Sequence, residues 1–249
     1  MNKSADRLQQ AVYIFTDLDD SLFQTGRKCP EQTSLFAAAM DRHGQTLSYF
    51  TGAQKLLLTL FEQGTVIPVT GRNTTALERV HLRFTNYCVT SHGALILTPE
   101  GQPDTAWLIA CQARYGDWAE RMETASQQIN QWIERSRLVL RCRVIEDHDL
   151  PVYVSIKGDE SDLEQVACYA SEIWQGEDVQ VHRNGQNMAL LPPFASKENA
   201  VEFLMRRFTE TDAEPLFLGL GDSITDLPFL RLCHYAITPR DSQIQESWG

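Results

Sequence analysis

Three carboxylates stand within four positions of one another in the stretch from Thr16 to Asp20. In an extended chain the side chains of Asp17 and Asp19 point to the same side, because successive strand residues face opposite sides. Two carboxylates a few ångströms apart resist joint ionisation unless a cation lies between them. The pair therefore predicts a divalent metal site, and Mg²⁺ suits an all-oxygen site that also contacts a substrate phosphate. An Asp-x-Asp pair alone is a weak signal, because a solvated acidic loop has the same composition.

A short apolar run precedes these carboxylates and must position them. Residues Val12 to Phe15 are β-branched and aromatic, too few for a helix, and polar residues follow them at once. Such a run is typical of a buried parallel strand. Open α/β sheets bind ligands at the carboxyl ends of their strands. We therefore expect Asp17 and Asp19 at the ligand-binding edge of a parallel sheet.

A second predicted strand ends in groups that suit a phosphate. The run from Thr65 to Val69, in which Pro68 favours an edge strand, leads into Thr70, Gly71 and Arg72. A hydroxyl and a guanidinium can donate hydrogen bonds to phosphoryl oxygens, and a glycine lets the backbone approach them closely. These three residues are candidates for contacting the phosphate.

Later in the chain, two more segments supply charged groups of the same kind. Lys197 stands in the first turn of a predicted helix, and the buried run Leu216 to Leu220 leads into Asp222 and Asp226. Each of these residues has an ordinary role when it is taken alone, as a helix cap or a solvated first-turn side chain. Their shared place at predicted strand and helix ends makes a common site the better interpretation.

Composition limits the classes of partner. The chain has 249 residues, of which 43% are hydrophobic, enough for a sizeable core. Its formal charge of −11 argues against nucleic acid or an acidic membrane as a partner, since either needs a basic face. No apolar run reaches the roughly 20 residues of a membrane helix, and Met1 to Gln10 lack a signal-peptide core, so we expect a cytoplasmic protein. The six cysteines form no C-x-x-C pair, which indicates reduced thiols.

The middle of the chain has a different pattern from its two ends. It contains a long helical stretch followed by strands and another helix, which is an α+β pattern of its own. We expect a Rossmann-like α/β core, with a parallel sheet and helices on both faces, formed by residues 1–93 and 188–249. Residues 94–187 would form an inserted α+β cap domain, and the strand at 188–191 would belong to the core.

Two features of this division could help to form a binding cleft. A predicted β-hairpin at 35–50 follows the acidic strand end and can cover it. In the cap, Lys157, His182 and Arg183 are polar groups that can face the cleft and recognise substrate hydroxyls. A hairpin turn at Asn184 explains part of this polarity equally well.

The order of these segments resembles the haloacid dehalogenase superfamily over nearly the whole chain. The resemblance is carried by Asp17-x-Asp19, the strand-end Thr70, Lys197 and Gly221-Asp222-x-x-x-Asp226. The inserted α+β segment and the Gly-Asp-Ser sequence at 221–223 resemble the branch with sucrose-phosphate, mannosyl-phosphoglycerate and trehalose-phosphate phosphatases. Asp20-Ser21, Glu198 and His92 depart from the usual Gly-Thr, Gly and Asn of the family.

This resemblance implies a Mg²⁺-dependent phosphatase that acts on a small phosphate monoester, most simply a sugar phosphate. It implies that Asp17 is the nucleophile and forms an aspartyl-phosphate, and that Asp19 protonates the leaving alcohol and then deprotonates the attacking water. The metal ligands would be Asp17, the backbone carbonyl of Asp19, and Asp222 with Asp226 beside or behind it. Thr70 and Lys197 would hold phosphoryl oxygens.

Two other functions remain open at the level of sequence. A phosphomutase of the same superfamily would share the catalytic residues. A phosphoacceptor signalling module also uses an acidic pair, a Thr and a Lys, but it needs an acceptor aspartate at another strand end. Between Asp20 and Thr70 the chain offers only Asp41, in the predicted hairpin turn.

Overall fold

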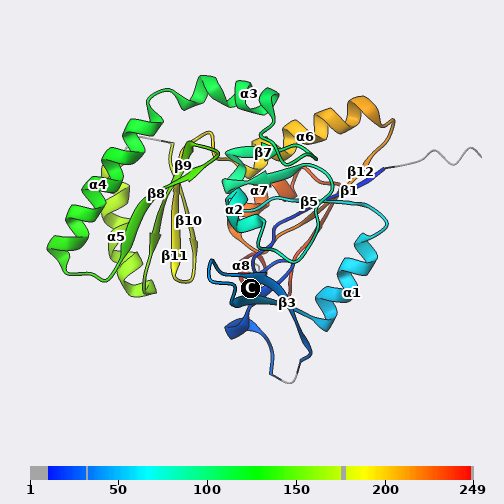
Figure 1. Ribbon diagram of the computed structural model, residues 1–249, viewed down its shortest axis with the longest axis horizontal. Coiled ribbons are helices and arrows are strands. Elements are labelled where there is room, and N and C mark those ends of the chain that lie inside the picture. The colour runs from blue at the N-terminus through cyan, green and yellow to red at the C-terminus, as the bar shows by residue number, and fades with distance from the viewer. Residues whose placement is uncertain (1–10, 32, 175–177, 248–249) are drawn as a thin grey trace, which may run out of the picture.

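The computed structural model describes residues 11–31, 33–174 and 178–247, so the polar segment Met1–Gln10 lies outside it. Two four-stranded sheets organise this part of the chain, one on each side of Figure 1. Among the described residues, no helix combines the length and apolar character that crossing a membrane requires.

The first sheet is parallel and has the strand order β13-β12-β1-β5. Its strands are β1 (Val12–Thr16), β5 (Thr65–Pro68), β12 (Leu216–Leu220) and β13 (Tyr235–Ile237). β1 lies inside the sheet, with Thr16 opposite Leu220 on one side and opposite Pro68 on the other. The carboxyl ends of β1, β5 and β12 therefore meet at one edge, as the apolar runs of the sequence predicted.

Helices cover both faces of this sheet, because the side chains of β1 alternate between two hydrophobic clusters. The helices are α1 (Gly52–Phe61), α2 (Thr74–Leu77), α6 (Lys197–Thr211), α7 (Leu227–Leu230) and α8 (Gln243–Glu246). On one face, Tyr13 stacks on Phe208 of α6 with ring centroids 3.9 Å apart. On the other face, Ile14 belongs to the cluster that contains Phe61 of α1. This arrangement confirms the predicted α/β core.

A smaller pair of strands lies beyond β5, at the edge where the carboxyl ends of the parallel strands meet. β6 (Cys88–Thr90) forms a parallel bridge between Val89 and Val69, and it pairs with the antiparallel β7 (Leu95–Leu97). The turn between them is the 3₁₀ helix Ser91–Gly93. Gly93 has a φ of +93°, and a Cβ there would lie 2.2 Å from the carbonyl oxygen of Ser196. Only glycine lets this turn pack against the start of α6.

The predicted hairpin is present and projects from the end of the acidic loop. It consists of β3 (Leu35–Met40) and β4 (Thr46–Thr51), and the two-residue β2 (Gln24–Thr25) pairs with β4. The backbone of β3 also bonds to the segment after α2, with the N–H of His81 donating to Ala38 at 2.7 Å. The hairpin is thereby fixed beside the carboxyl ends of the parallel strands.

The second sheet is antiparallel and has the strand order β10-β11-β9-β8. Its strands are β8 (Arg141–Asp147), β9 (Leu150–Lys157), β10 (Gln180–Asn184) and β11 (Asn187–Leu191). The helices in this part of the chain are α3 (Thr105–Tyr115), α4 (Trp118–Ser136) and α5 (Glu160–Ile173). Figure 1 shows α4 and α5 on the side of the sheet that is turned away from the parallel sheet. The opposite face is therefore available to form a cleft with the core.

Strand β11 corrects one sequence-based assignment. The apolar run at 188–191 predicted a strand of the core, but β11 pairs antiparallel with β9 and β10 in the second sheet. The four residues are all buried, so their apolar run lacks the alternation that separates a cap strand from a core strand. At the other boundary, Trp107 of α3 packs against Phe203 of α6. We propose that the core extends to about residue 116 and resumes at about residue 192, with the cap between them.

Candidate active site

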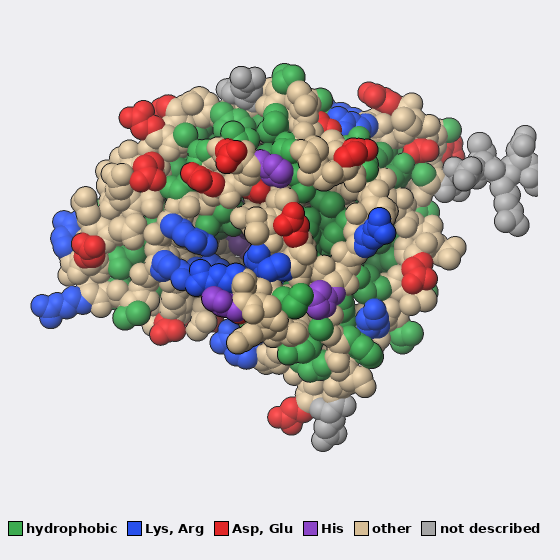
Figure 2. Space-filling model, viewed as in Figure 1, with side chains coloured by type: hydrophobic (Ala, Val, Ile, Leu, Met, Phe, Trp, Pro, Cys, Tyr) green, Lys and Arg blue, Asp and Glu red, His purple; other side chains and the backbone are tan. Residues whose placement is uncertain are grey.

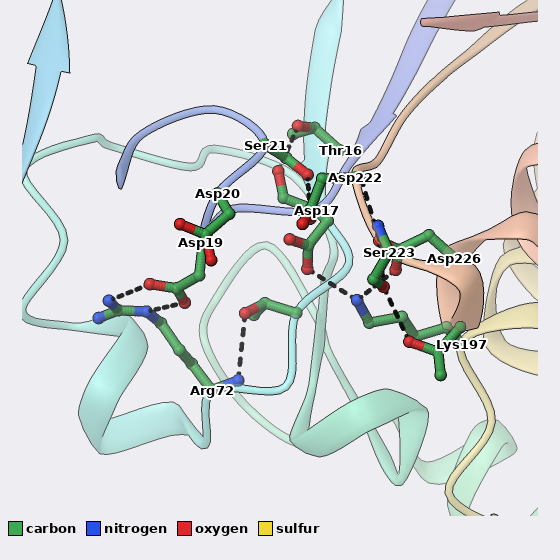
Figure 3. A network of polar contacts seen from close by, with 12 residues as sticks. Thr16, Asp17, Asp19, Asp20, Ser21, Arg72, Lys197, Asp222, Ser223 and Asp226 are labelled. Carbon is green, nitrogen blue, oxygen red and sulfur yellow. Dashed lines mark hydrogen bonds and ion pairs between the residues drawn. The ribbon is translucent and has the colours of Figure 1, made fainter. Parts of the chain in front are cut away.

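Four predicted site residues, Asp17, Lys197, Asp222 and Asp226, come together at the edge where the parallel strands end (Figure 3). Thr70 follows β5 at the same edge, where the N–H of Val69 donates to the carbonyl of Thr16 at 2.7 Å. All five of these side chains are buried. Asp17 follows β1 and its N–H donates to the carbonyl of Leu220 at 2.8 Å, which ties the acidic loop to the end of β12. The gathering follows from the parallel arrangement, since neighbouring strands end at the same edge.

Lys197 joins two of the carboxylates. Its Nζ donates to Oδ1 of Asp17 and to Oδ1 of Asp226, each at 2.7 Å. Ser196 caps α6 by accepting a hydrogen bond from the N–H of Asn199 at 3.2 Å, so the lysine stands at the first position of the helix. Burial lowers the pKa of Lys197, but the two carboxylates outweigh that effect and raise it above its ordinary value. The side chain is therefore a fixed cation at neutral pH.

Asp17, Asp222 and Asp226 form a cluster in which one oxygen from each lies within 4.8 Å of the others. Burial is the main cause that raises the pKa of Asp17 well above its ordinary value, and the charges of Asp226 and Asp222 add to it against the effect of Lys197. Burial and the charge of Asp226 likewise raise the pKa of Asp222 to about 6. Three buried carboxylates thus face a single ammonium group.

The hydrogen bonds around this cluster separate the roles of its members. One oxygen of Asp226 accepts from Lys197, and the other accepts from the N–H of Asp222 at 3.3 Å and from the hydroxyl of Ser223 at 2.8 Å. Oδ1 of Asp222 accepts from the hydroxyl of Ser21 at 2.9 Å. Asp17 and Asp222 each keep one oxygen with no hydrogen bond from the described residues. Asp226 instead orients the lysine and the loop after β12.

The donor set fits a divalent metal that prefers oxygen ligands. Hard cations such as Mg²⁺ are held by one or two carboxylates and retain several waters. The remaining oxygens of Asp17 and Asp222 meet this requirement, and the excess negative charge of the cluster is what a cation would offset. These residues would hold Mg²⁺, with Asp226 behind them.

Asp19 does not take the position that strand alternation predicted. β1 ends at Thr16, and the following residues turn back, with the N–H groups of Leu22 and Phe23 both donating to the carbonyl of Leu18. The Asp19 carboxylate instead forms a two-pronged pair with Arg72, from Nε to Oδ2 and from Nη2 to Oδ1, each at 2.7 Å. Figure 3 shows it directed away from Lys197. The carboxylates beside Asp17 come from the loop after β12.

The segment after β5 supplies the predicted Thr-Gly-Arg group. The hydroxyl of Thr70 accepts from the N–H of Arg72 at 3.1 Å, which shapes the turn. A Cβ on Gly71 would lie 2.4 Å from the imidazole of His92, so a side chain cannot fit between this turn and His92. His92 itself packs at 5.1 Å against the rings of Tyr153 and His182 from the cap sheet. Its burial there lowers its pKa well below the ordinary value, so it is neutral.

Core and cap together enclose a cleft of about 1120 Å³. Two of the predicted cap residues, Lys157 and His182, line it. The prediction for Arg183 was wrong, because β10 alternates and turns this side chain to the other face, where its Nη2 lies 3.7 Å from Oε1 of Glu164. Arg141 and Arg143 also line the cleft, although they were not among the residues predicted to do so. Their i, i+2 spacing in β8 is the signal that could have found them.

Direct hydrogen bonds dock the cap on the core in this structure. Nδ2 of Asn184 donates to Oδ2 of Asp20 at 2.8 Å, and Nδ1 of His182 lies 2.8 Å from the hydroxyl of Thr225. The hydroxyl of Ser91 also donates to Asp147 of β8 at 2.7 Å. The cleft is therefore bounded by contacts between core and cap on more than one side.

No family model matches the chain, and no curated protein sequence matches it. Solved structures do match. The sucrose-phosphatase of Synechocystis, in complex with sucrose and phosphate, is 19% identical over 96% of this chain and 87% of that chain, with a TM-score of 0.54. The C-terminal domain of the C. albicans trehalose-6-phosphate phosphatase is 14% identical over 89% of this chain and 73% of that chain, with a TM-score of 0.57. A trehalose-6-phosphate phosphatase related protein is 17% identical over 91% and 85%, with a TM-score of 0.50.

At 14 to 19% identity, these likenesses show that the chain shares its overall fold with the solved phosphatases named above. They cover nearly the whole chain, cap included.

Proposed function

We propose that this chain is a Mg²⁺-dependent phosphatase that hydrolyses a phosphate monoester through an aspartyl-phosphate at Asp17. The observation that carries the proposal is the buried arrangement in which Lys197 bridges Asp17 and Asp226 beside Asp222. A nucleophilic carboxylate, a fixed cation and an all-oxygen metal site are the parts that phosphoryl transfer needs. The named activities of the structural neighbours support the same reading.

In the first step, a carboxylate oxygen of Asp17 attacks phosphorus and the bond from phosphorus to the ester oxygen breaks. The ammonium group of Lys197 and the hydroxyl of Thr70 stabilise the charge that develops on the phosphoryl oxygens. When the substrate binds, the pair of Asp19 with Arg72 must loosen and the Asp19 carboxylate must take up a proton from solvent, which it then donates to the departing alcohol. Asp17, Asp222 and the backbone carbonyl of Asp19 would hold Mg²⁺, which would supply further charge neutralisation when bound.

In the second step, water attacks the phosphorus of the aspartyl-phosphate and Asp19 accepts its proton. The acyl-phosphate bond breaks, inorganic phosphate leaves, and the Asp17 carboxylate is restored. The docked cap limits access of bulk water to this step. Neither step changes an oxidation state, so neither needs an oxidant or a reductant.

A sugar phosphate is the substrate class that we propose for this site. The cleft of about 1120 Å³ is larger than a phosphate alone requires, and its cap wall carries hydrogen-bonding groups such as Asn184 and Asn187. One structural neighbour was solved with sucrose and phosphate. We further propose that the core binds the phosphate and the cap selects the remainder of the substrate.

A screen of phosphorylated mono- and disaccharides with and without Mg²⁺ tests this proposal, with free phosphate as the readout. We expect Mg²⁺-dependent release from at least one sugar phosphate and from p-nitrophenyl phosphate. Conversion of a hexose 1-phosphate to its isomer without net phosphate release would instead indicate a phosphomutase. Stable phosphorylation of the protein without turnover would indicate a signalling module.

A further inference from the structure

One face of the cap sheet concentrates positive charge over the cleft. Arg141 and Arg143 lie two residues apart on β8, so their side chains share a face, and Lys157 is the direct cross-strand partner of Arg141 on β9. All three residues line the cleft. Figure 2 shows Lys and Arg side chains gathered beside the hollow between cap and core. We call these three residues the cap triad.

The carboxylates that line the cleft already have other partners. Lys197 pairs with Asp17, Arg72 pairs with Asp19 and Lys28 pairs with Asp20. Two more carboxylates line the cleft: Asp41 accepts the N–H groups of its own turn at 2.7 and 2.9 Å, and Asp222 accepts the hydroxyl of Ser21 at 2.9 Å. Within the described residues, no member of the cap triad lies within ion-pair distance of a carboxylate.

On the other face of the same sheet, an arginine does have a carboxylate partner. Arg183 of β10 lies 3.7 Å from Glu164 of α5. The chain as a whole carries 33 acidic residues against 22 Lys and Arg, so a cluster of unpaired cations runs against its average composition. If these cations were ordinary solvated surface residues, there would be no reason for the three of them to gather on the face that lines the cleft.

The three positive charges of the cap triad repel one another when no anion is bound between them. The walls of the cleft remove water from Lys157 and lower its pKa, and the charges of Arg141 and Arg143 lower it further. A like charge disfavours the protonated lysine, and an anion bound between these groups reverses that effect. Arginine is also suited to two-pronged contacts with planar carboxylate or with phosphate.

We propose, on the basis of the phosphatase function above, that the cap triad binds a second anionic group of the substrate, a carboxylate or a phosphate that is not cleaved. The scissile phosphate has its own cation, Lys197, buried in the core at the ends of the parallel strands. The cap triad belongs to the opposite wall and is exposed to the cleft. A neutral sugar would need amide and hydroxyl partners rather than three cations. The substrate class is therefore a phosphate monoester that carries further negative charge.

Two matched pairs of substrates test this inference. 6-Phosphogluconate and sorbitol 6-phosphate differ at the far end by a carboxylate in place of a hydroxymethyl group, and fructose 1,6-bisphosphate and fructose 6-phosphate differ by a phosphate. We expect kcat/KM to be about 10- to 100-fold higher for the charged member of at least one pair, the effect of one or two charged hydrogen bonds. The pair that shows it identifies the anion as carboxylate or phosphate.

The double variant Arg141→Gln/Arg143→Gln should remove most of that preference and leave hydrolysis of p-nitrophenyl phosphate unchanged. Arg183→Gln is the matched control, because it removes an arginine from the other face of the same sheet, and it should keep the preference. The inference is overturned if neither pair shows a preference, or if the double variant loses activity equally on all substrates.

A binding measurement separates this inference from the proposed function. Calorimetric titration of the Asp17→Asn protein with both members of each pair measures affinity without turnover. The cap triad is supported if the member with the second anionic group binds more tightly and this difference depends on Arg141 and Arg143, even if no substrate is hydrolysed. The absence of hydrolysis would count against the phosphatase function alone. Equal affinities for both members of both pairs contradict the cap triad, whatever the wild-type protein hydrolyses.

Discussion

The two walls of the cleft handle charge in opposite ways. On the core wall, the side chains of Asp17, Lys197 and Asp226 are buried and bonded to one another. On the cap wall, Arg141 and Arg143 are exposed and lack a carboxylate partner among the described residues. Groups that act on the same phosphoryl unit in every turnover benefit from being fixed before the substrate arrives. Groups that recognise the variable part of a substrate remain open until it binds.

This contrast predicts that changes to the core wall affect every substrate alike, whereas changes to the cap wall affect only some substrates. The largest effect should come from Asp17→Asn, which removes the nucleophile. We expect the turnover of all phosphate esters to fall by about 10⁴-fold or more, since the covalent step is lost. Phosphate release by the variant and its circular dichroism spectrum check the prediction together. Near-wild-type turnover in a folded variant would refute the role of Asp17.

The next effect in size should come from Asp19→Asn, which removes the proposed acid and base. The expected loss is about 10²- to 10⁴-fold. It should be smaller for p-nitrophenyl phosphate than for a sugar phosphate, because a phenolate leaves without much help from an acid. Asp20→Asn is the neighbouring control, since Asp20 contacts Lys28 and Asn184 and has no proposed chemical role. Equal losses for Asp19→Asn and Asp20→Asn would indicate that the loop, rather than the carboxyl of Asp19, is being disturbed.

A third and smaller effect concerns Lys157, on the cap wall. We expect Lys157→Ala to raise KM for a phosphate monoester with a second anionic group by about tenfold. Its kcat for that substrate and its hydrolysis of p-nitrophenyl phosphate should stay nearly unchanged. The reason is that Lys157 lines the cleft from β9 of the cap, whereas the residues that we propose act on phosphorus belong to the core. A parallel loss on the aryl phosphate would place Lys157 with the core wall and remove the contrast between the two walls.

Metal binding should produce the smallest change, measured as a shift in melting temperature. At pH 7.5 a Mg²⁺ concentration of about 100 times Kd should raise Tm by about 5 to 10 °C relative to EDTA. The shift should shrink as the pH falls through about 6, the raised pKa of Asp222, because a protonated carboxyl must lose its proton to bind metal. Without metal, this raised pKa means that the stability contributed by protonated Asp222 is lost as the pH rises through the same value.

The Asp222→Asn protein supplies the control for this measurement. It should show a Mg²⁺ shift at pH 7.5 that is much smaller than that of the wild type. A wild-type shift that does not depend on pH would contradict the assignment of Asp222 as a ligand.

Much of the core could be predicted from the sequence, because buried parallel strands leave a clear pattern. Each apolar run ends abruptly in polar residues, and the ends of parallel strands meet at one edge, which brought Asp17, Thr70 and Asp222 together. The strand that was misplaced, β11, is buried along its length and carries no alternation. Its pairing with β9 is decided by tertiary contacts that no local pattern records.

The errors at the site have local causes. Asp17 and Asp19 would share a face only if the strand continued, but it ends at Thr16 and Asp20 adopts a φ of +64°. His182 and Arg183 were predicted together, yet adjacent strand residues face opposite sides and only one of them can line the cleft. Which of the two does so depends on how the sheet packs, which the sequence alone does not specify.

Trapping of the covalent intermediate tests the central claim most directly. The protein is mixed with Mg²⁺ and a hydrolysed phosphate ester, quenched during turnover and treated with borohydride, which reduces an aspartyl-phosphate to homoserine. Peptide mass spectrometry should then find homoserine at position 17, and only when substrate is present. Steady phosphate release with unmodified Asp17, or with homoserine at another aspartate, would contradict the account.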